Sequence, residues 1–230
     1  MKKGKFIVLD GNDGSGKATQ SRLLVKRLSE EGVESMALDF PAYNRNFFGA
    51  LIGECLAGKH GDFLHLDPKI ASTLYALDRL ESSKEIRTAL AEGDVIIADR
   101  FASSNQIHQG GKIADENERT EFLRWLDKME HEVLRIPRPD LIIYLRVPTE
   151  VSIELLSKKR IAKNQVLGAD MKDTVEEDRT YLERSHATAN WLAGHQSNWK
   201  VIECAPQGVM RSVEDIQTEI RQIVEDLFRG

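Results

Sequence analysis

The feature that most constrains the fold of this 230-residue chain is the stretch FIVLDGNDGSGKATQ at positions 6–20. Its apolar start is typical of a buried strand, and leucines at 23, 24 and 28 resume the apolar pattern at helical spacing. In a glycine-rich loop between strand and helix, backbone amides turn inward and the helix start adds partial positive charge, so a polyphosphate binds there. The pattern G-x-x-x-x-G-K therefore predicts a nucleoside-triphosphate site, with Lys17 reaching the β- and γ-phosphates. The residues predicted to bind the triphosphate are Gly11, Asn12, Asp13, Gly14, Ser15, Gly16, Lys17, Ala18 and Thr19.

Position 18 departs from this pattern, because Ala18 stands where a serine or threonine hydroxyl would bind magnesium. Magnesium keeps several waters and needs few protein ligands, so a water can take that place if a carboxylate lies opposite. Asp99 ends an apolar run, and an acid at the carboxyl end of a strand faces the phosphates in a P-loop fold. We therefore expect Mg²⁺ as cofactor, held by Asp99 partly through water.

Composition limits the class of protein. It shows no break along the chain, so we expect one domain over residues 1–230. A net charge of -5 argues against a nucleic-acid-binding surface. Cys55 and Cys204 are too few for a disulfide framework or a zinc site, so we expect both thiols to be reduced in a cytoplasmic protein. We find no apolar run long enough to span a membrane, and the one that follows Lys5 is too short for a signal peptide.

Short apolar runs alternate with segments of helical periodicity. Strands are expected at 6–9, 33–40, 94–99, 141–145 and 199–203. Helices are expected at 44–56, from Pro68 onward, and at 103–109, 116–134, 149–161 and 173–193, with a last helix after the capping box that begins at Ser212. This alternation predicts an α/β protein: a three-layer P-loop fold with a five-stranded parallel sheet and helices on both faces.

Two polar clusters lie outside the phosphate loop. Tyr75 and Arg79 are four residues apart on one helix, beside a predicted buried stripe that includes Ile70. Asp99 and Arg100 precede a short helix on which Asn105, His108 and Gln109 share a face. Amides and hydroxyls beside a phosphate site suit the recognition of a heterocycle, although a polar helix facing water would have the same pattern.

Two further segments have open interpretations. In the helix 116–134, Phe122, Trp125, Leu126, Met129 and Val133 form an apolar stripe that is either core or a dimer interface. The connection 162–172 lacks periodicity and follows the basic cluster Lys158-Lys159-Arg160. Such a cluster is either a solvated face or part of a mobile lid over the phosphates, at about 158–173.

Taken together, the ordered motifs resemble those of thymidylate kinases, in the nucleoside-monophosphate kinase branch of P-loop NTPases, over nearly the whole chain. The matching segments are GNDGSGKATQ, Phe40-Pro41, the YALDR stretch at 75–79, Asp99-Arg100-Phe101 and the polar helix that follows. The resemblance implies transfer of the ATP γ-phosphoryl group to dTMP, giving dTDP and ADP for dTTP synthesis, by a protein that is usually a homodimer. Its implied acceptor region, at about 40–110 with the loop acid, contributes Asp13, Phe40, Pro41, Arg45, Tyr75, Arg79, Arg100, Ser104, Asn105, His108 and Gln109 to dTMP binding.

The same resemblance implies roles. Tyr75 stacks on the thymine, Asn105 and Gln109 read its polar edge, and Arg100, Arg79 and Arg45 hold the acceptor phosphate. Some relatives carry a catalytic arginine directly after the loop acid and others carry it in the lid; Gly14 and Arg160 indicate the second arrangement. The implied catalytic residues are Lys17, Asp99, Arg100 and Arg160.

Some positions depart from the family pattern and leave alternatives open. His108 stands where many relatives have a tyrosine that helps to exclude a 2′-hydroxyl, and Val175 occupies another aromatic position. The chain could instead act on dUMP or a broader range of pyrimidine nucleotides. Ala18 also makes a non-catalytic nucleotide-binding module conceivable. A regulatory GTPase is disfavoured, because the sequence has no Asn-Lys-x-Asp motif.

Overall fold

The computed structural model describes residues 4–167 and 179–229, with the backbone alone for 159–167. Among the described residues, five strands form one parallel sheet in the order β2-β3-β1-β4-β5. The strands are β1 (Lys5–Gly11), β2 (Ser35–Asp39), β3 (Val95–Asp99), β4 (Leu141–Arg146) and β5 (Trp199–Glu203). The predicted fold class and all five strands are thus confirmed, and β1, which leads into the phosphate loop, is the central strand.

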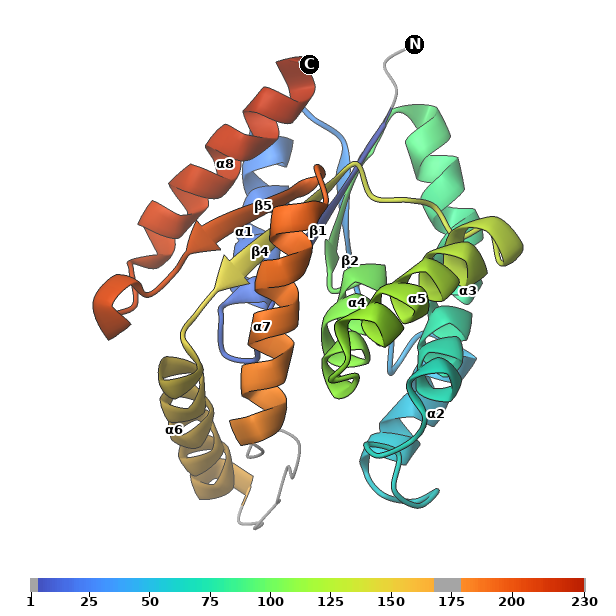
Figure 1. Cartoon of the computed structure of the whole chain (residues 1–230). Coiled ribbons are helices and arrows are strands. Elements are labelled where there is room, and N and C mark those ends of the chain that lie inside the picture. Colours follow the sequence, from blue (N-terminus) through green and yellow to red (C-terminus); the bar gives the residue numbers. More distant parts are fainter. Residues whose placement is uncertain (1–3, 168–178, 230) are drawn as a thin grey trace.

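Helices cover both faces of the sheet, as predicted (Figure 1). One face carries α1 (Lys17–Glu30) and α8 (Val213–Arg229), which pack on Ile7 and Leu9 of β1. The opposite face carries α3 (Pro68–Glu92), α4 (Ala102–His108), α5 (Glu116–Asp127) and α7 (Arg179–His195), around Phe6 and Val8. The remaining helices are α2 (Phe47–Leu56), α6 (Thr149–Leu167), the 3₁₀ turns η1 (Gly110–Lys112) and η3 (Pro206–Gly208), and the π-helical turn η2 (Lys128–Val133).

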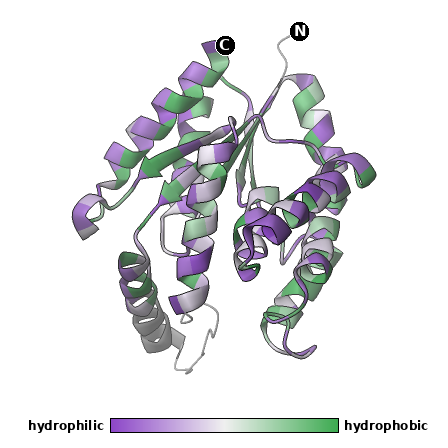
Figure 2. Ribbon diagram, in the orientation of Figure 1, coloured by the Kyte–Doolittle hydropathy of each residue, from purple (hydrophilic) through white to green (hydrophobic). Residues whose placement is uncertain are grey.

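Alternation along β1 explains the layers, because successive side chains of a strand point to opposite faces. In Figure 2 the strands are mainly green and the helices mix green and purple, so each helix has an apolar side and a polar side. The capping box is also present: the Asp215 amide donates to Ser212 Oγ over 3.0 Å at the start of α8. No helix among the described residues is long and apolar enough to cross a lipid bilayer.

Most of the apolar stripe of 116–134 contributes to the core of the chain. Phe122 and Leu126 are buried in the main cluster, Trp125 and Met129 pack against it, and only Val133 is exposed. The expected continuous α-helix is wrong in its last part, where the π-helical turn η2 replaces it and buries Glu130 completely.

Other boundaries differ from the expectation. Ile70 does not lie on a buried stripe of α3, since 62% of it is exposed. Apart from Ile86, the buried residues of this helix are small or polar, among them Ser72, Ala76 and Arg79. The segment 162–167 is helical, as the end of α6, and not the start of a connection. The rest of that connection and the predicted helix start at 173–178, Val175 included, lie outside the described residues.

Candidate active site

The phosphate loop joins β1 to α1 at the carboxyl edge of the sheet, where α/β proteins place their ligands. Gly14 and Gly16 have φ values of 82° and 91°, a left-handed conformation that glycine adopts without steric cost. Asn12 and Ser15 are buried in this loop. The side-chain atoms Oδ1 and Nδ2 of Asn12 have no hydrogen-bond partner among the described residues. The loop therefore combines the backbone geometry of an anion cradle with buried polar groups.

Lys17 lies inside this cradle and is bonded to it. Its Nζ donates to the carbonyl oxygens of Gly11 over 2.9 Å and Asn12 over 2.8 Å, and it lies 3.8 Å from the Asp13 carboxylate. Burial, together with the charge of Arg100, lowers the pKa of Lys17 to about 8. The ammonium is thus held at the mouth of the loop by contacts that an anionic phosphate oxygen can replace.

Arg100 joins the phosphate loop to the polar helix α4. Its backbone has a φ of 68°, an uncommon value for a residue other than glycine, which turns the chain directly after β3. The guanidinium donates to Asp13 Oδ1, and its Nη1 lies 3.1 Å from His108 Nε2. Burial alone would raise the pKa of Asp13, but the charges of Arg100 and Lys17 hold it well below its usual range. An ionised carboxylate and two cations therefore converge beside the loop.

Asp10, which the motif analysis does not single out, anchors this arrangement. It is fully buried, and its carboxylate accepts hydrogen bonds from Ser103 Oγ over 2.6 Å and Ser104 Oγ over 2.8 Å. These bonds tie the first turn of α4 to the end of β1. Ser104, a predicted dTMP contact, is thus engaged with Asp10. The sequence signal was an acid inside the buried strand, directly before the first glycine of the loop.

A second buried network lies between α3, α4 and the π-helical turn. Arg79 is 2% exposed, and it donates from Nε and Nη2 to the two carboxylate oxygens of Glu130, over 2.8 Å and 2.6 Å. Asn105 Nδ2 donates to Glu130 Oε1 and to the Ser72 carbonyl oxygen, over 3.2 Å each. Glu130 was not among the site residues predicted from the sequence. It could have been noticed there, because it lies four residues after Leu126 and eight after Phe122, as a carboxylate on an otherwise apolar helical stripe.

Three more residues that were predicted to contact the base or sugar of dTMP lie on α3 or at the end of α4. Tyr75 is half-buried, 5.7 Å from the ring of Phe63, and burial raises the pKa of its hydroxyl. The His108 ring stacks on Tyr181 of α7, with centroids 5.7 Å apart. Gln109, at the end of α4, is buried, and its Oε1 has no hydrogen-bond partner within the part of the chain that the structure describes.

The structure places other predicted site residues elsewhere. Phe40 is 5% exposed and packs edge-on against Phe101 in the core. The next residue, Pro41, is half-buried. Arg45 pairs with Glu85 on α3 over 3.3 Å. In the expected lid, Lys158 pairs with Glu154, whereas the side chains of Lys159 and Arg160 lie outside the described residues.

Asp99 is the residue here that fits a magnesium ion. It is partly exposed at the end of β3, and burial with the neighbouring carboxylates Asp10 and Asp13 raises its pKa against the opposing charges of Lys17 and Arg100. A divalent cation would relieve that repulsion. Ala18 offers no ligand and Thr19 is half-buried. No group of three or more His, Cys, Asp or Glu side chains within 4–158 or 179–229 could hold a metal ion, and magnesium shared with substrate phosphates needs no such group.

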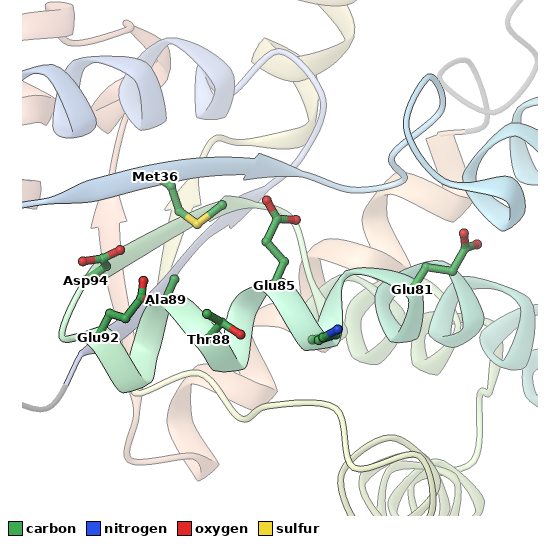
Figure 3. A pocket seen from close by; sticks show the side chains of 8 residues that line it. Met36, Glu81, Glu85, Thr88, Ala89, Glu92 and Asp94 are labelled. Atoms are coloured by element: carbon green, nitrogen blue, oxygen red, sulfur yellow. The ribbon is translucent and has the colours of Figure 1, made fainter.

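A groove of about 540 Å³ between α3 and the edge strand β2 is a different kind of surface (Figure 3). In Figure 3 the carboxylate of Glu85 points from the helix towards β2, near Met36. Glu81, Glu92 and Asp94 add three more carboxylates, and Lys84 is the cation of the lining. This excess of negative charge repels phosphate groups, so the groove does not suit the substrates that the phosphate loop and Arg100 attract.

A glycine-rich phosphate loop after the central strand, a buried lysine at its end and an acid at the end of the adjacent strand β3 are the features of a P-loop nucleotide-binding protein. Comparison with known proteins narrows this class. The family model described as "Thymidylate kinase" matches residues 9–220. A thymidylate kinase of Mycobacterium tuberculosis is 29% identical over 199 residues, which cover 86% of this chain and 90% of that protein. A probable thymidylate kinase of Pyrococcus horikoshii is 30% identical over an aligned length of 234 positions, and the alignment covers 99% of each chain. The chain belongs to the thymidylate kinase family.

Proposed function

We propose that the chain transfers the γ-phosphoryl group of ATP to dTMP, giving ADP and dTDP, in the space between the phosphate loop and α4. The observation that carries this proposal is the position of Arg100, which bonds the loop acid Asp13 and contacts His108 of the polar helix. One cation thus lies between a donor-phosphate cradle and an acceptor-facing helix. Family membership supports the same reaction.

The charged residues divide the work of phosphoryl transfer. The reaction needs in-line positioning and compensation of charge more than covalent chemistry, and a phosphate acceptor already carries its own charge, so no strong general base is required. Lys17 and the loop amides hold the donor phosphates, and Arg100 holds the acceptor phosphate. Asp13, kept ionised by its two cationic neighbours, lies beside them and accepts a hydrogen bond from the 3′-hydroxyl of the acceptor sugar.

Magnesium and the lid complete the donor side. Asp99 would hold Mg²⁺, partly through water, and the ion would supply charge neutralisation on the donor phosphates. Arg160, with Lys158 or Lys159, closes over the same phosphates in the lid. Arg45 faces Glu85, so it has to leave that ion pair before it can contact the acceptor.

The base-reading side consists of Tyr75, Arg79, Asn105 and Gln109. Tyr75 stacks on the thymine, and the three polar residues read its edge. Arg79 belongs with this group more than with the phosphate, because it shares the carboxylate of Glu130 with Asn105. The Tyr75→Ala variant should bind dTMP about 5-fold to 150-fold more weakly in calorimetry, since base stacking is worth about 1–3 kcal/mol. Unchanged affinity would contradict this role.

A broader acceptor range is the second candidate, favoured by His108 in place of the family's tyrosine. The test is coupled ADP release with ATP and magnesium, using dTMP, dUMP, UMP and dCMP at equal concentration beside a control without acceptor. We expect the fastest turnover with dTMP. Equal rates with UMP would show that His108 does not exclude a 2′-hydroxyl. ATP binding without ADP release under every condition would instead indicate a non-catalytic nucleotide-binding module.

Two further properties follow from the family. We propose a homodimer, and a monomeric mass in light scattering would reject it. We also propose that the protein works in the cytoplasm, because Cys55 and Cys204 are both buried free thiols.

A further inference from the structure

Glu130 is a buried acid of the acceptor side that the proposed reaction does not use directly. It is 0% exposed and lies on the π-helical turn η2, and such turns occur often at functional sites. Its two carboxylate oxygens accept hydrogen bonds from Arg79 on α3, and one of them also accepts from Asn105 on α4. A single side chain therefore connects two proposed base-reading residues from different helices.

The hydrogens in this network can be counted. The Asn105 amide has two N–H donors, and Nδ2 donates both to the Ser72 carbonyl and to Glu130. Both partners are acceptors, so the amide cannot be reversed without placing its oxygen against two other oxygens. The Asn105 group left to meet a ligand is therefore the Oδ1 acceptor.

The same count applies to Arg79. A guanidinium has five N–H donors, and the bonds to Glu130 use the Nε hydrogen and one Nη2 hydrogen. The second Nη2 hydrogen and both Nη1 hydrogens remain on the edge that faces away from the carboxylate. With Glu130 in place, a ligand base meets donors from Arg79 and an acceptor from Asn105.

This polarity matches one kind of pyrimidine. Thymine and uracil present an oxygen acceptor at position 4 and an N–H donor at position 3, whereas cytosine presents an amino donor at position 4 and an acceptor at position 3. A buried site built for one pattern rejects the other strongly, because the mismatched groups lose their hydrogen bonds. The network thus complements dTMP and opposes dCMP.

We propose that Glu130 is a positioning residue for base selection: by accepting from Arg79 and Asn105 it sets the donor and acceptor polarity that discriminates dTMP from dCMP. The inference rests on the proposed function, because it requires Arg79 and Asn105 to face the base. It adds a residue that does not itself touch the substrate.

The decisive variant is Glu130→Gln, which keeps the shape of the side chain but removes its charge and offers an amide donor. The orientation of the Asn105 amide is then fixed by the Ser72 carbonyl alone, and Arg79 loses its ionic partner. We expect the ratio of kcat/KM for dTMP to kcat/KM for dCMP to fall by roughly tenfold or more, mainly through a higher KM for dTMP. The KM for ATP should not change, since the donor phosphates lie on the other side of the site.

Control variants separate positioning from stability. Asp127→Asn removes a carboxylate from the preceding turn, where it pairs with Arg138 at the surface, and it should leave the dTMP/dCMP ratio unchanged. Glu130→Asp keeps an acceptor but shortens it, so its ratio should lie between those of the wild type and Glu130→Gln. If Glu130→Gln does not fold, Glu130→Asp decides, and a wild-type ratio in the folded variant would overturn the proposal.

A modified substrate distinguishes failure of this inference from failure of the proposed base-reading roles. N3-methyl-dTMP lacks the donor that Asn105 Oδ1 should accept, so the wild-type enzyme should bind it much more weakly than dTMP. Equal binding would contradict the base-reading role of Asn105, and the Glu130 proposal with it. Weak binding of the methylated nucleotide together with an unchanged ratio in Glu130→Gln would overturn the Glu130 proposal alone.

Discussion

The acceptor side and the donor side of this site hold their key cations in opposite ways. On the acceptor side, Arg79 forms two charge-assisted bonds with the buried carboxylate of Glu130. On the donor side, Lys17 donates to two neutral carbonyl oxygens of its own loop. Both sets of bonds have a charged donor, but the Arg79 pair is bidentate and joins two opposite full charges, whereas each Lys17 bond joins a cation to a neutral carbonyl. The comparison indicates that the proposed base-reading side is organised before substrate arrives, whereas the phosphate side exchanges its contacts when a phosphate binds.

The Lys17→Ala variant gives the largest expected effect and tests whether the two sides are independent. Loss of a cation from the donor phosphates should lower kcat by on the order of 10³, a size typical for the removal of a charge-stabilising group from a transition state. The affinity for dTMP, measured by calorimetry without ATP, should stay within about twofold of the wild type, since Arg79, Asn105 and Tyr75 are untouched. A parallel loss of dTMP affinity would mean that the phosphate loop also organises the acceptor side.

The Arg160→Ala variant should have the next largest effect. If this arginine neutralises charge that develops on the transferred group, kcat should fall by on the order of a hundredfold or more. Lys26→Ala is the control, because Lys26 pairs with Glu30 on the surface of α1, outside the proposed site, and its loss should change kcat only slightly. Similar losses in both variants would mean that a general loss of positive charge, and not the position of Arg160, lowers kcat.

The sequence predicted the fold well because its signals are local. Each strand is a short apolar run ended by a polar or turn residue, and the parallel order follows from the alternation with helices. Errors arose where burial does not follow apolarity. The buried face of α3 carries Ser72 and Arg79, while Ile70 is exposed, since this face packs against the polar α4 and the π-helical turn.

The site was predictable where a motif ties chemistry to spacing, as for Lys17, Asp13 and Arg100. Asp10 and Glu130 were missed because each acts through contacts that are distant in sequence: the Asp10–Ser103 bond spans 93 residues and the Arg79–Glu130 bond spans 51. Both acids nevertheless left a local trace, since Asp10 directly follows a buried apolar run and Glu130 lies at helical spacing on a stripe that is otherwise apolar. A charged residue at such a position indicates a buried partner, but the sequence alone does not identify it.

A smaller effect should appear in the pH dependence of the donor side. Lys17 has its pKa lowered to about 8, so it loses its proton within the working range of an enzyme. Because kcat/KM reports the free enzyme, kcat/KM for ATP should decline above about pH 8, by about tenfold per pH unit once Lys17 is mostly neutral. The Lys17→Arg variant, whatever its activity, should lack this decline, since arginine stays protonated. A decline that persists in Lys17→Arg would assign the titration to another group.

The smallest expected change is on the acceptor side, where His108 should not titrate near neutrality. Burial and the charge of Arg100 lower the pKa of His108 to about 4 from the ordinary value of 6.5. Between those values the unfolded chain binds a proton that the folded chain does not, so this histidine favours folding fully above pH 6.5 and less as the pH falls towards 4. In NMR spectra of the ligand-free protein, the His108 ring signals should stay constant from about pH 8 to pH 5.5, whereas in the urea-unfolded chain they should shift in that range.

The His108→Gln variant gives a second measurement of the same property. Its free energy of unfolding, measured in urea, should fall less than that of the wild type when the pH is lowered from about 7.5 to 5. A neutral His108 lets its Nε2 accept from Arg100 throughout the range in which Lys17 gains and loses its proton. Titration of His108 near pH 6.5 in the folded protein would remove that difference and make both sides of the site sensitive to pH.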